Sequence, residues 1–119
     1  MFEPTVIFGG YTCSVQFSHY HDDNLRISLV DLVNGSPVAT ATVNIEGVIL
    51  ASNEVCIKDY EENEGMLKAL KNAGIVERVV KIVQSDHVDV PVVQLTKNVM
   101  EVYDSIDGFN KVRGVAVHG

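Results

Sequence analysis

The sequence predicts an α+β fold: a mainly antiparallel β-sheet of five to seven strands with two helices packed on it. Three observations support this prediction. Apolar and polar residues alternate with a period of two through the first half of the chain, whereas helical spacing of apolar residues occurs in the second half. Turn-forming residues separate the alternating runs. The 119 residues allow one hydrophobic core, so we expect a single domain spanning residues 1–119.

The first half of the chain is expected to form hairpins. A short strand over Val6–Phe8 ends at a Gly-Gly pair, and in the run Tyr11–Phe17 every second side chain falls on one face. After a polar turn, Leu25–Leu32 alternates in a way typical of a strand that is partly buried on both faces. Asn34-Gly35 then predicts a tight turn, because both residues tolerate left-handed backbone angles.

Three apolar segments follow this turn. Val38–Ile45 is rich in threonine and valine and is expected to return as the next strand. The short piece Val48–Leu50 is either an edge strand or a loop packed on the core. Glu54–Lys58 has the composition of a further strand. We therefore expect strand structure to continue to Lys58.

One amphipathic helix is expected next, beginning near Glu62, capped by Asp59 or Tyr60, and ending at Gly74 in a left-handed conformation. Several glutamates stand near its start, where the helix dipole favours negative charge. The crowded charged, aromatic and amide groups at this entrance are expected to bind an anion or a polar small molecule. The apolar stripe of the helix consists of Met66, Leu67, Leu70 and Ala73.

Two more strands and a second helix are expected toward the C-terminus. Ile75–Val83 and Val88–Leu95 are apolar and β-branched, and a polar turn separates them. Pro91 lacks a backbone donor, which predicts that the second of these strands lies at an edge of the sheet. Apolar residues recur at helical spacing over Lys97–Ile106, and the tail to Gly119 is expected to be a strand or an interface arm.

Charge and surface pattern restrict the possible partners. The formal net charge of −7 opposes binding to nucleic acid phosphates and to anionic membranes. No apolar run approaches the roughly 20 residues that a membrane-spanning helix needs. Exposed strand edges and an apolar tail predict self-association, because uncovered apolar edges favour pairing. We therefore expect a homo-oligomer with no nucleic acid partner and no membrane association.

The two cysteines, Cys13 and Cys56, lie within apolar alternation, which predicts reduced and buried thiols. The first thirty residues show no charged segment followed by an apolar one, which favours an intracellular protein.

No motif for catalysis is present. No serine or cysteine lies next to a recognisable base, and the Gly9-Gly10 pair lacks the rest of a dinucleotide-binding pattern. His19, His21 and the Asp22-Asp23 pair offer donors for a metal, but a structural site needs three or four convergent ligands, so a solvated turn is expected instead. We therefore expect no enzyme, no catalytic residue, no cofactor and no metal.

Side chains suited to binding a small phosphorylated molecule remain. Arginine and lysine can contact a phosphate, aromatic rings can stack on a base, and an amide can read the edge of a base. The alternative is that the aromatic residues belong to the core and the basic residues balance acidic neighbours. On this chemistry the expected ligand-binding residues are Arg26, Lys58, Tyr60, Asn63, Phe109 and Arg113.

The centre of the chain resembles a group of small bacteriophage and mobile-element proteins. The similarity lies in the run Ile57–Leu67, then in Ala73-Gly74-Ile75, Gln84-Ser85 and Val90-Pro91-Val92 with Leu95. On these residues the chain is similar to the anti-Thoeris sponge proteins, and the layout of residues 10–95 is also alike.

The resemblance implies a non-catalytic protein that sequesters a cyclic ADP-ribose-type or related cyclic nucleotide immune signal, and so counters an anti-phage defence that depends on TIR domains. It also implies an oligomer with ligand pockets between protomers, acting in the cytoplasm of an infected bacterial host cell. Two other functions fit the sequence: an acidic protein-interaction inhibitor of a bacterial defence enzyme, and a structural accessory protein of a phage or plasmid.

Overall fold

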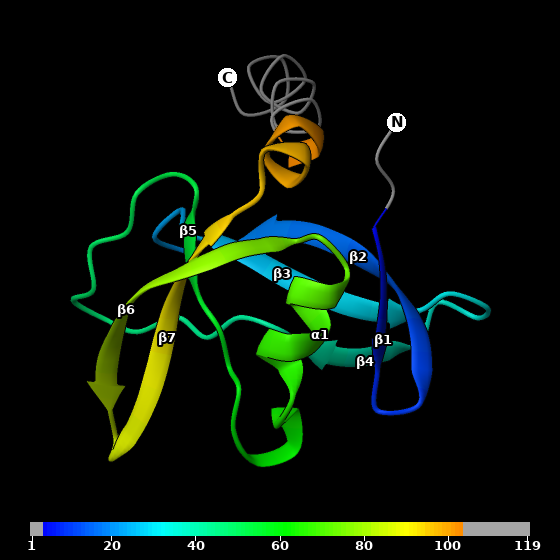
Figure 1. Ribbon diagram of the computed structural model, residues 1–119, viewed down its shortest axis with the longest axis horizontal. Coiled ribbons are helices and arrows are strands. Elements are labelled where there is room, and N and C mark those ends of the chain that lie inside the picture. The colour runs from blue at the N-terminus through cyan, green and yellow to red at the C-terminus, as the bar shows by residue number, and fades with distance from the viewer. Residues whose placement is uncertain (1–3, 104–119) are drawn as a thin grey trace.

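The computed structural model describes residues 4–103, and the seven strands found there form two antiparallel sheets (Figure 1). The larger sheet contains β1 (Thr5–Phe8), β2 (Tyr11–His19), β3 (Leu25–Asp31) and β4 (Pro37–Thr40). The smaller sheet contains β5 (Glu54–Cys56), β6 (Val76–Ser85) and β7 (Val88–Leu95). The helical elements are a 3₁₀ turn, η1 (Glu61–Asn63), the helix α1 (Met66–Asn72) and residues 97–103. The α+β fold is confirmed, but its strands divide between two sheets.

The larger sheet follows from the alternation of its sequence. Its strands lie in the order β1-β2-β3-β4, so each pairs with its neighbour along the chain. Cys13 in β2 pairs with Val6 on one side and with Asp31 on the other. Alternate residues such as Cys13, Ile27 and Leu29 are fully buried on the inner face. The predicted hairpins of the first half are therefore confirmed.

The fourth strand is shorter than predicted, and its expected extension to Ile45 is wrong, because the chain leaves the larger sheet after β4. The N–H of Ala41 donates to the carbonyl of Ile27 in β3 at 2.8 Å. The carbonyl of Ala41 accepts the N–H of Lys58, just beyond β5, at 2.9 Å. We call residues 38–44 the crossing segment, since they run from β4 in the larger sheet to the bridge that Thr42 makes with Ile57 beside the smaller sheet.

The smaller sheet has the order β5-β7-β6, so β7 is central and the predicted edge position of Pro91 is wrong. Pro91 is tolerated because β5 ends at Cys56. The carbonyl of Pro91 accepts the N–H of Ile57 at 3.0 Å, while Ile82 is its partner in β6. Because the nitrogen and carbonyl of one residue point to the same side of a strand, the missing donor faces Ile57 and the ladder with β6 loses no hydrogen bond at Pro91.

The two faces of the smaller sheet belong to two apolar clusters. Val93 and Leu95 of β7 face the main core, which also contains Met66 and Leu70 of α1 and the inner face of the larger sheet. The opposite face carries the second cluster, whose buried members are Cys56, Val90 and Val92. Burial on both faces explains why β7 is apolar without interruption over residues 90–93. The partly buried members of the second cluster are Val43, Ile45, Val48, Leu50, Tyr60, Val83 and Val88.

Residues 48–50 form a loop that packs on this second cluster, so the packed-loop alternative is confirmed. Val48 and Leu50 contact the cluster, whereas Ile49 is 87% exposed. The outer face of the smaller sheet is therefore covered by irregular chain, with no strand of its own.

The single helix predicted to begin near Glu62 is two separate elements. Residues 61–63 form η1, and Gly65, with φ of 94°, separates this turn from α1. A helix cannot continue through a left-handed residue, which is why α1 begins only at Met66. The glutamates at 61, 62 and 64 consequently precede the α-helix.

The predicted end of α1 at Gly74 is confirmed. Gly74 has φ of 75°, and its N–H donates to the carbonyl of Lys71 at 3.1 Å. The N–H of Ile75 donates to the carbonyl of Leu70 at 3.0 Å. These two hydrogen bonds form a Schellman motif, which requires the left-handed conformation that glycine adopts without strain.

Residues 97–103 contain the second predicted helix. Its N-cap is Thr96, whose Oγ1 accepts the N–H of Val99 at 3.3 Å. Val99 is fully buried in the main core. The predicted end of this helix at Ile106 and the tail, with Phe109 and Arg113, lie outside the described residues.

Cys13 and Cys56 are both free and buried, as predicted. Burial raises the pKa of each thiol, because the apolar surroundings disfavour the thiolate. No helix within residues 4–103 combines the length and the apolar character that crossing a lipid bilayer requires. Self-association stays a prediction.

Candidate functional site

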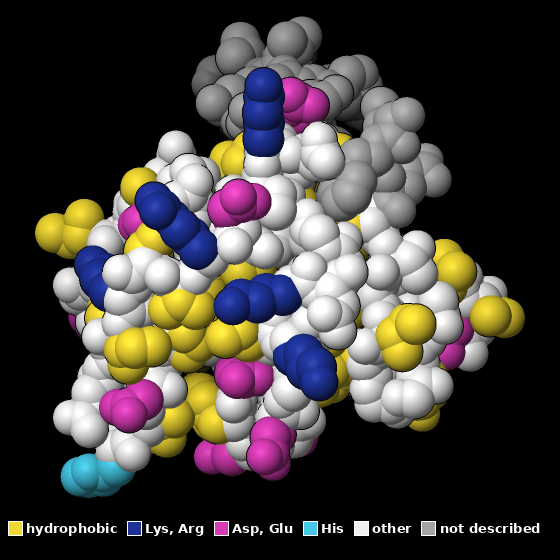
Figure 2. All heavy atoms as spheres, in the orientation of Figure 1, with side chains coloured by type: hydrophobic (Ala, Val, Ile, Leu, Met, Phe, Trp, Pro, Cys, Tyr) yellow, Lys and Arg dark blue, Asp and Glu magenta, His cyan; other side chains and the backbone are white. Residues whose placement is uncertain are grey.

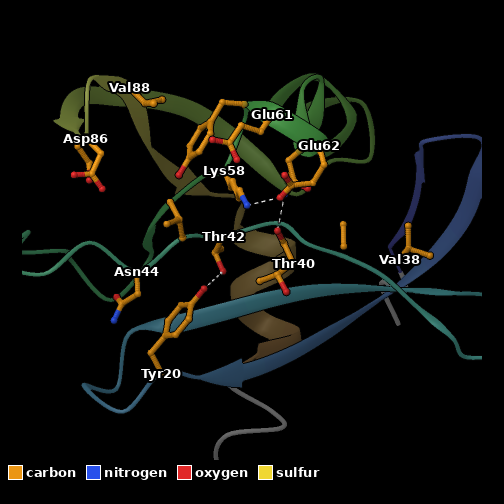
Figure 3. A pocket seen from close by; sticks show the side chains of 15 residues that line it. Tyr20, Val38, Thr40, Thr42, Asn44, Lys58, Glu61, Glu62, Asp86 and Val88 are labelled. Atoms are coloured by element: carbon orange, nitrogen blue, oxygen red, sulfur yellow. Dashed lines mark hydrogen bonds and ion pairs between the residues drawn. The ribbon is translucent and has the colours of Figure 1, made fainter.

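A pocket of about 770 Å³ opens beside the crossing segment (Figure 3). Its walls come from the residue after β2, the crossing segment, the stretch of residues 58–63 before α1, and the turn between β6 and β7. The volume falls within the range of about 300–1,000 Å³ that is usual for small-molecule sites. Because these segments are far apart in the sequence, the pocket exists only in the folded chain.

Tyr20 and Thr42 form one wall of the pocket through a shared hydrogen-bond system. The buried Oγ1 of Thr42 accepts the N–H of Ile27 at 3.2 Å and lies 2.9 Å from the hydroxyl of Tyr20. Figure 3 marks the hydrogen bond between Tyr20 and Thr42. The guanidinium of Arg26 lies over the ring of Tyr20, with Cζ 5.9 Å from the ring centroid. The crossing segment therefore fixes Tyr20 at the pocket, because Thr42 binds both β3 and the tyrosine.

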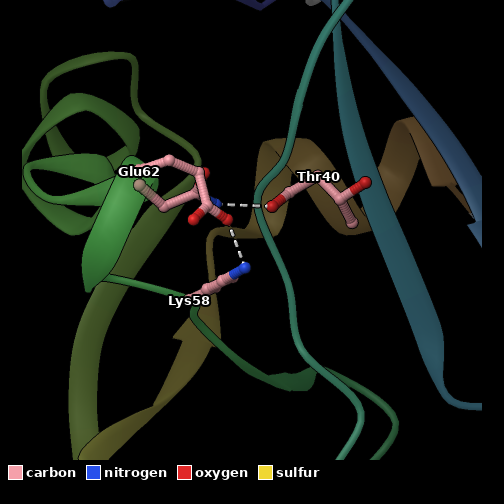
Figure 4. Close-up of polar contacts among 4 residues, drawn as sticks. Thr40, Lys58 and Glu62 are labelled. Atoms are coloured by element: carbon pink, nitrogen blue, oxygen red, sulfur yellow. Dashed lines mark hydrogen bonds and ion pairs between the residues drawn. The ribbon is translucent and has the colours of Figure 1, made fainter.

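Asn63 anchors the opposite wall to the crossing segment. Its side chain is only 3% exposed, and Nδ2 donates to the carbonyl of Thr40 at 2.7 Å (Figure 4). Its N–H donates to the carbonyl of Tyr60 at 3.0 Å. A buried amide that satisfies a backbone carbonyl has a structural role, because removing it leaves that carbonyl without its partner.

Lys58 lies in the pocket as one half of an ion pair. Its Nζ is hydrogen-bonded to Oε1 of Glu62 (Figure 4) and lies 5.7 Å from the centroid of the Tyr60 ring. This hydrogen bond raises the pKa of Lys58 and lowers the pKa of Glu62, so both groups hold their charges more firmly. The Lys58 and Glu62 side chains are 27% and 64% exposed, so the pair contributes little to the stability of the fold.

The charges that line the pocket are mostly negative. Glu61, Glu62 and Asp86 supply three carboxylates, and Lys58 is the one basic residue among the lining residues that the structure describes. In Figure 2, acidic side chains gather at the lower edge of the molecule, over the region before α1. The described lining therefore favours a neutral or positively charged guest over an anion.

Two of these carboxylates belong to residues with a positive φ. Glu61 has φ of 54° and Asp86 has φ of 49°. Asp86 and His87, with φ of 67°, form the two-residue turn between β6 and β7, where positive φ is usual. Glu61 is the first central residue of the turn that the N–H of Asn63 closes on the carbonyl of Tyr60, and a glutamate held at positive φ there is strained.

The predicted anion site at the helix entrance is already filled by the protein. Oδ1 of Asp59 accepts the N–H groups of Gly65 at 3.1 Å and Leu67 at 3.0 Å. Asp59 was one of the two predicted caps, and it acts across the intervening η1 turn. Because its carboxylate already stands at the entrance of α1 and accepts the N–H groups of the N-cap Gly65 and of Leu67, the pocket beside the crossing segment is the better candidate site.

The structure brings three of the six predicted binding residues together. Lys58, Tyr60 and Asn63 all line the pocket. Arg26 is exposed on β3 and reaches the site only through its contact with the Tyr20 ring. The other two, at positions 109 and 113, lie outside the described residues.

Sequence reasoning missed Tyr20, Thr42 and Asp86 as lining residues. Thr42 gave a usable signal, because a threonine within a run of apolar residues needs a hydrogen-bond partner when it is buried. Tyr20 and Asp86 lie in polar turns, where nothing in the local pattern separates a lining residue from a solvated one.

The polar turn after β2 has a structural role. Oδ2 of Asp22 accepts the side-chain N–H groups of Asn44 at 3.0 Å and Asn24 at 3.3 Å. The hydrogen bond from Asn44 is the main cause of the lowered pKa of Asp22. Nε2 of His19 lies against the hydroxyl of Tyr103 instead of facing the turn. Across residues 4–103 no three histidine, cysteine or acidic side chains converge as metal ligands would.

Comparison of the chain with protein-family models, curated proteins and solved structures gave no match. The resemblance to anti-Thoeris sponge proteins therefore stays a prediction from the sequence.

Proposed function

We propose that this protein is a non-catalytic binding protein that holds a small polar molecule in the pocket beside the crossing segment. The observation that carries the proposal is the pocket of about 770 Å³, with its tyrosines and charged groups drawn from distant segments. A site of this volume can enclose a guest of nucleoside size.

The electrostatics of the pocket support binding over catalysis. A general acid or base works best when its pKa lies near the operating pH. The Lys58–Glu62 pair moves the pKa of the lysine up and that of the glutamate down, away from neutrality in both cases. Such a pair suits a stable wall better than a proton-transfer group.

Sequestration of a cyclic ADP-ribose-type immune signal during phage infection is the specific form of this function that the resemblance implies. Tyr60 offers a ring for adenine and Lys58 a cation for phosphate, provided that Glu62 releases it. An exposed ion pair is weak enough for such an exchange. Two further phosphate contacts were expected from Arg26 and Arg113, of which Arg26 stands outside the pocket lining.

Thermal unfolding with a ligand panel tests the proposal. The panel contains cyclic ADP-ribose isomers, cyclic dinucleotides, simple nucleotides and the corresponding nucleosides. A ligand at a hundredfold excess over its Kd should add about 2.7 kcal/mol to the free energy of unfolding. The ligand should be recovered chemically unchanged after incubation, and turnover of it would contradict sequestration.

A matched pair of variants locates the binding. Tyr60→Leu removes a ring that lines the pocket while keeping an apolar side chain, and should weaken binding about tenfold, or about 1.4 kcal/mol. Tyr11→Leu removes a tyrosine that is 52% exposed and does not line the pocket, and should leave binding unchanged. If no compound shifts the melt while one host protein is captured from bacterial lysate, the inhibitor function replaces this proposal.

A further inference from the structure

We infer that the pocket selects guests that carry a positive charge on or beside a flat ring, and that it discriminates against anions of the same size. This inference rests on the general binding function proposed above and names the chemical class of its ligand. Because it disfavours a diphosphate, it opposes the cyclic ADP-ribose-type form that the resemblance implies. It follows from three properties of the described lining: the positions of the carboxylates, the ion pair of the lysine, and the protein cations that lie over the tyrosine rings.

The carboxylates come from two separate parts of the chain. Glu61 belongs to η1, and Asp86 belongs to the turn between β6 and β7. Figure 3 shows both on the other side of the pocket from Tyr20. Both side chains are exposed and neither forms an ion pair in the described part of the chain, so their charge acts on whatever enters.

The lysine offsets these carboxylates only in part, because it is attracted to Glu61 but is hydrogen-bonded to a third carboxylate. Its ammonium is hydrogen-bonded to Glu62, and that bond raises the pKa of Lys58. A neutral or cationic guest leaves this pair intact. An anionic guest must separate Lys58 from Glu62 and then lie near Glu61 and Asp86, which repel it.

The two tyrosines are placed to attract cations. The ring of Tyr20 has the guanidinium of Arg26 above it at 5.9 Å, and the ring of Tyr60 has the ammonium of Lys58 at 5.7 Å. Both distances lie within the roughly 6 Å over which a ring face attracts a positive charge. Each ring already has a protein cation over it, so a cationic guest must take the place of one of them. A cationic ring that displaces the exposed Arg26 can stack on Tyr20 while its charge faces a carboxylate, whereas an anion obtains neither contact.

Three molecules that share one ring test the charge preference directly. They are 1-methylnicotinamide, which is a cation, nicotinamide, which is neutral, and nicotinate, which is an anion. Titration of each into the full chain, followed by amide chemical shifts, should give the tightest binding for the cation and the weakest for the anion. We expect at least about a tenfold difference in Kd between these two, decreasing as salt is added.

Variants assign the preference to the named carboxylates. The double variant Glu61→Gln, Asp86→Asn should bring the cation and the anion to within about threefold of each other, because it removes two lining charges without a change of shape. Asparagine tolerates the positive φ at position 86, so the turn is retained. Glu77→Gln is the matched control, because Glu77 is exposed on β6 and does not line the pocket.

The outcomes separate the two proposals. Equal binding of the three probes, tighter binding of nicotinate, or binding of none of them at millimolar concentration overturns the charge preference while the wider nucleotide panel still tests the binding function. A cation preference that survives in the double variant also overturns it. Failure of every compound in both panels to shift resonances around the pocket removes the binding function itself.

Discussion

The two faces of β7 are equally apolar but are covered very differently. Val93 and Leu95 face the main core, where the larger sheet, α1 and residues 97–103 close over them. Val90 and Val92 face the second cluster, whose cover is a loop and partly buried side chains. Val43, Tyr60 and Val88 belong to that cover and also line the pocket. The comparison teaches that the pocket lies on the face of β7 that is covered by irregular chain, whereas the opposite face is covered by a sheet and helices.

The largest effect is expected from a matched pair of leucines, one on each side of β7. Leu70→Ala in the main core should lower the free energy of unfolding by about 2–5 kcal/mol, because it leaves a cavity among fully buried side chains. Leu50→Ala in the second cluster should cost about 1 kcal/mol, because its site is already partly open. Urea denaturation measures both, and equal losses would break the comparison.

The next largest effect on stability is expected at the hydrogen bond from Asn63 to the crossing segment. Asn63→Ala should lower the free energy of unfolding by about 1–3 kcal/mol, because the Thr40 carbonyl loses its buried donor. Asn72→Ala, at the exposed last residue of α1, is the control and should stay within about 0.5 kcal/mol of the parent. An unchanged urea midpoint for Asn63→Ala would mean that the wall is not held through this bond.

The cap formed by Asp59 gives a smaller effect. Asp59→Ala should cost about 0.5–2 kcal/mol, because the N–H groups of Gly65 and Leu67 lose their acceptor. Asp59→Asn keeps an acceptor oxygen and should retain most of the stability. Thermal unfolding checks the order of the two variants. A larger loss for asparagine than for alanine would show that the helix entrance is not capped in this way.

The smallest effect concerns the ion pair in the pocket. The lowered pKa of Glu62 means that its share of the pair is present above an unfolded-state pKa of about 4.3 and is lost as pH falls through the lower folded value. The raised pKa of Lys58 means that its share is present below about 10.4 and is lost as pH rises through the higher folded value. Near neutral pH this pair therefore leaves stability independent of pH.

Lys58→Met tests that pair without relying on stability. The pKa of Glu62, followed by carboxyl NMR, should rise toward its ordinary value, because the main cause of its lowering is the hydrogen bond from Lys58. Lys71→Met, on the exposed end of α1, should leave the pKa of Glu62 unchanged. A Glu62 pKa that does not respond to Lys58→Met would remove the argument that the lysine is already engaged.

Much of the fold could be predicted from the sequence because its signals are local. The alternation in β2 and β3 and the glycine at position 74 each act within a few residues, and the structure contains the expected elements. The errors concern relations over longer distances. Pro91 is tolerated in the central strand because β5 ends opposite it, and α1 is capped by Asp59 from six residues before Gly65. Local pattern contains neither fact.

Only the part of the candidate site that is contiguous in the sequence could be predicted. Lys58, Tyr60 and Asn63 lie within one short stretch, so their chemistry could be seen together. Tyr20 and Asp86 join them only because the chain passes from one sheet to the other. That passage depends on how two sheets pack, which a single sequence does not specify locally.

Ala41 gives the pocket a property that its lining alone does not. One face of this residue's backbone is bonded to Ile27 in the larger sheet and the other to Lys58 beside the smaller one. Any rocking of the sheets against each other must stretch one of these bonds, and it must also deform the pocket, because the neighbouring Thr40 and Thr42 line it. A guest that fills the cavity is expected to restrain this motion and to slow hydrogen exchange at the amides of Ala41 and Lys58. Ligand binding is then detectable in both sheets.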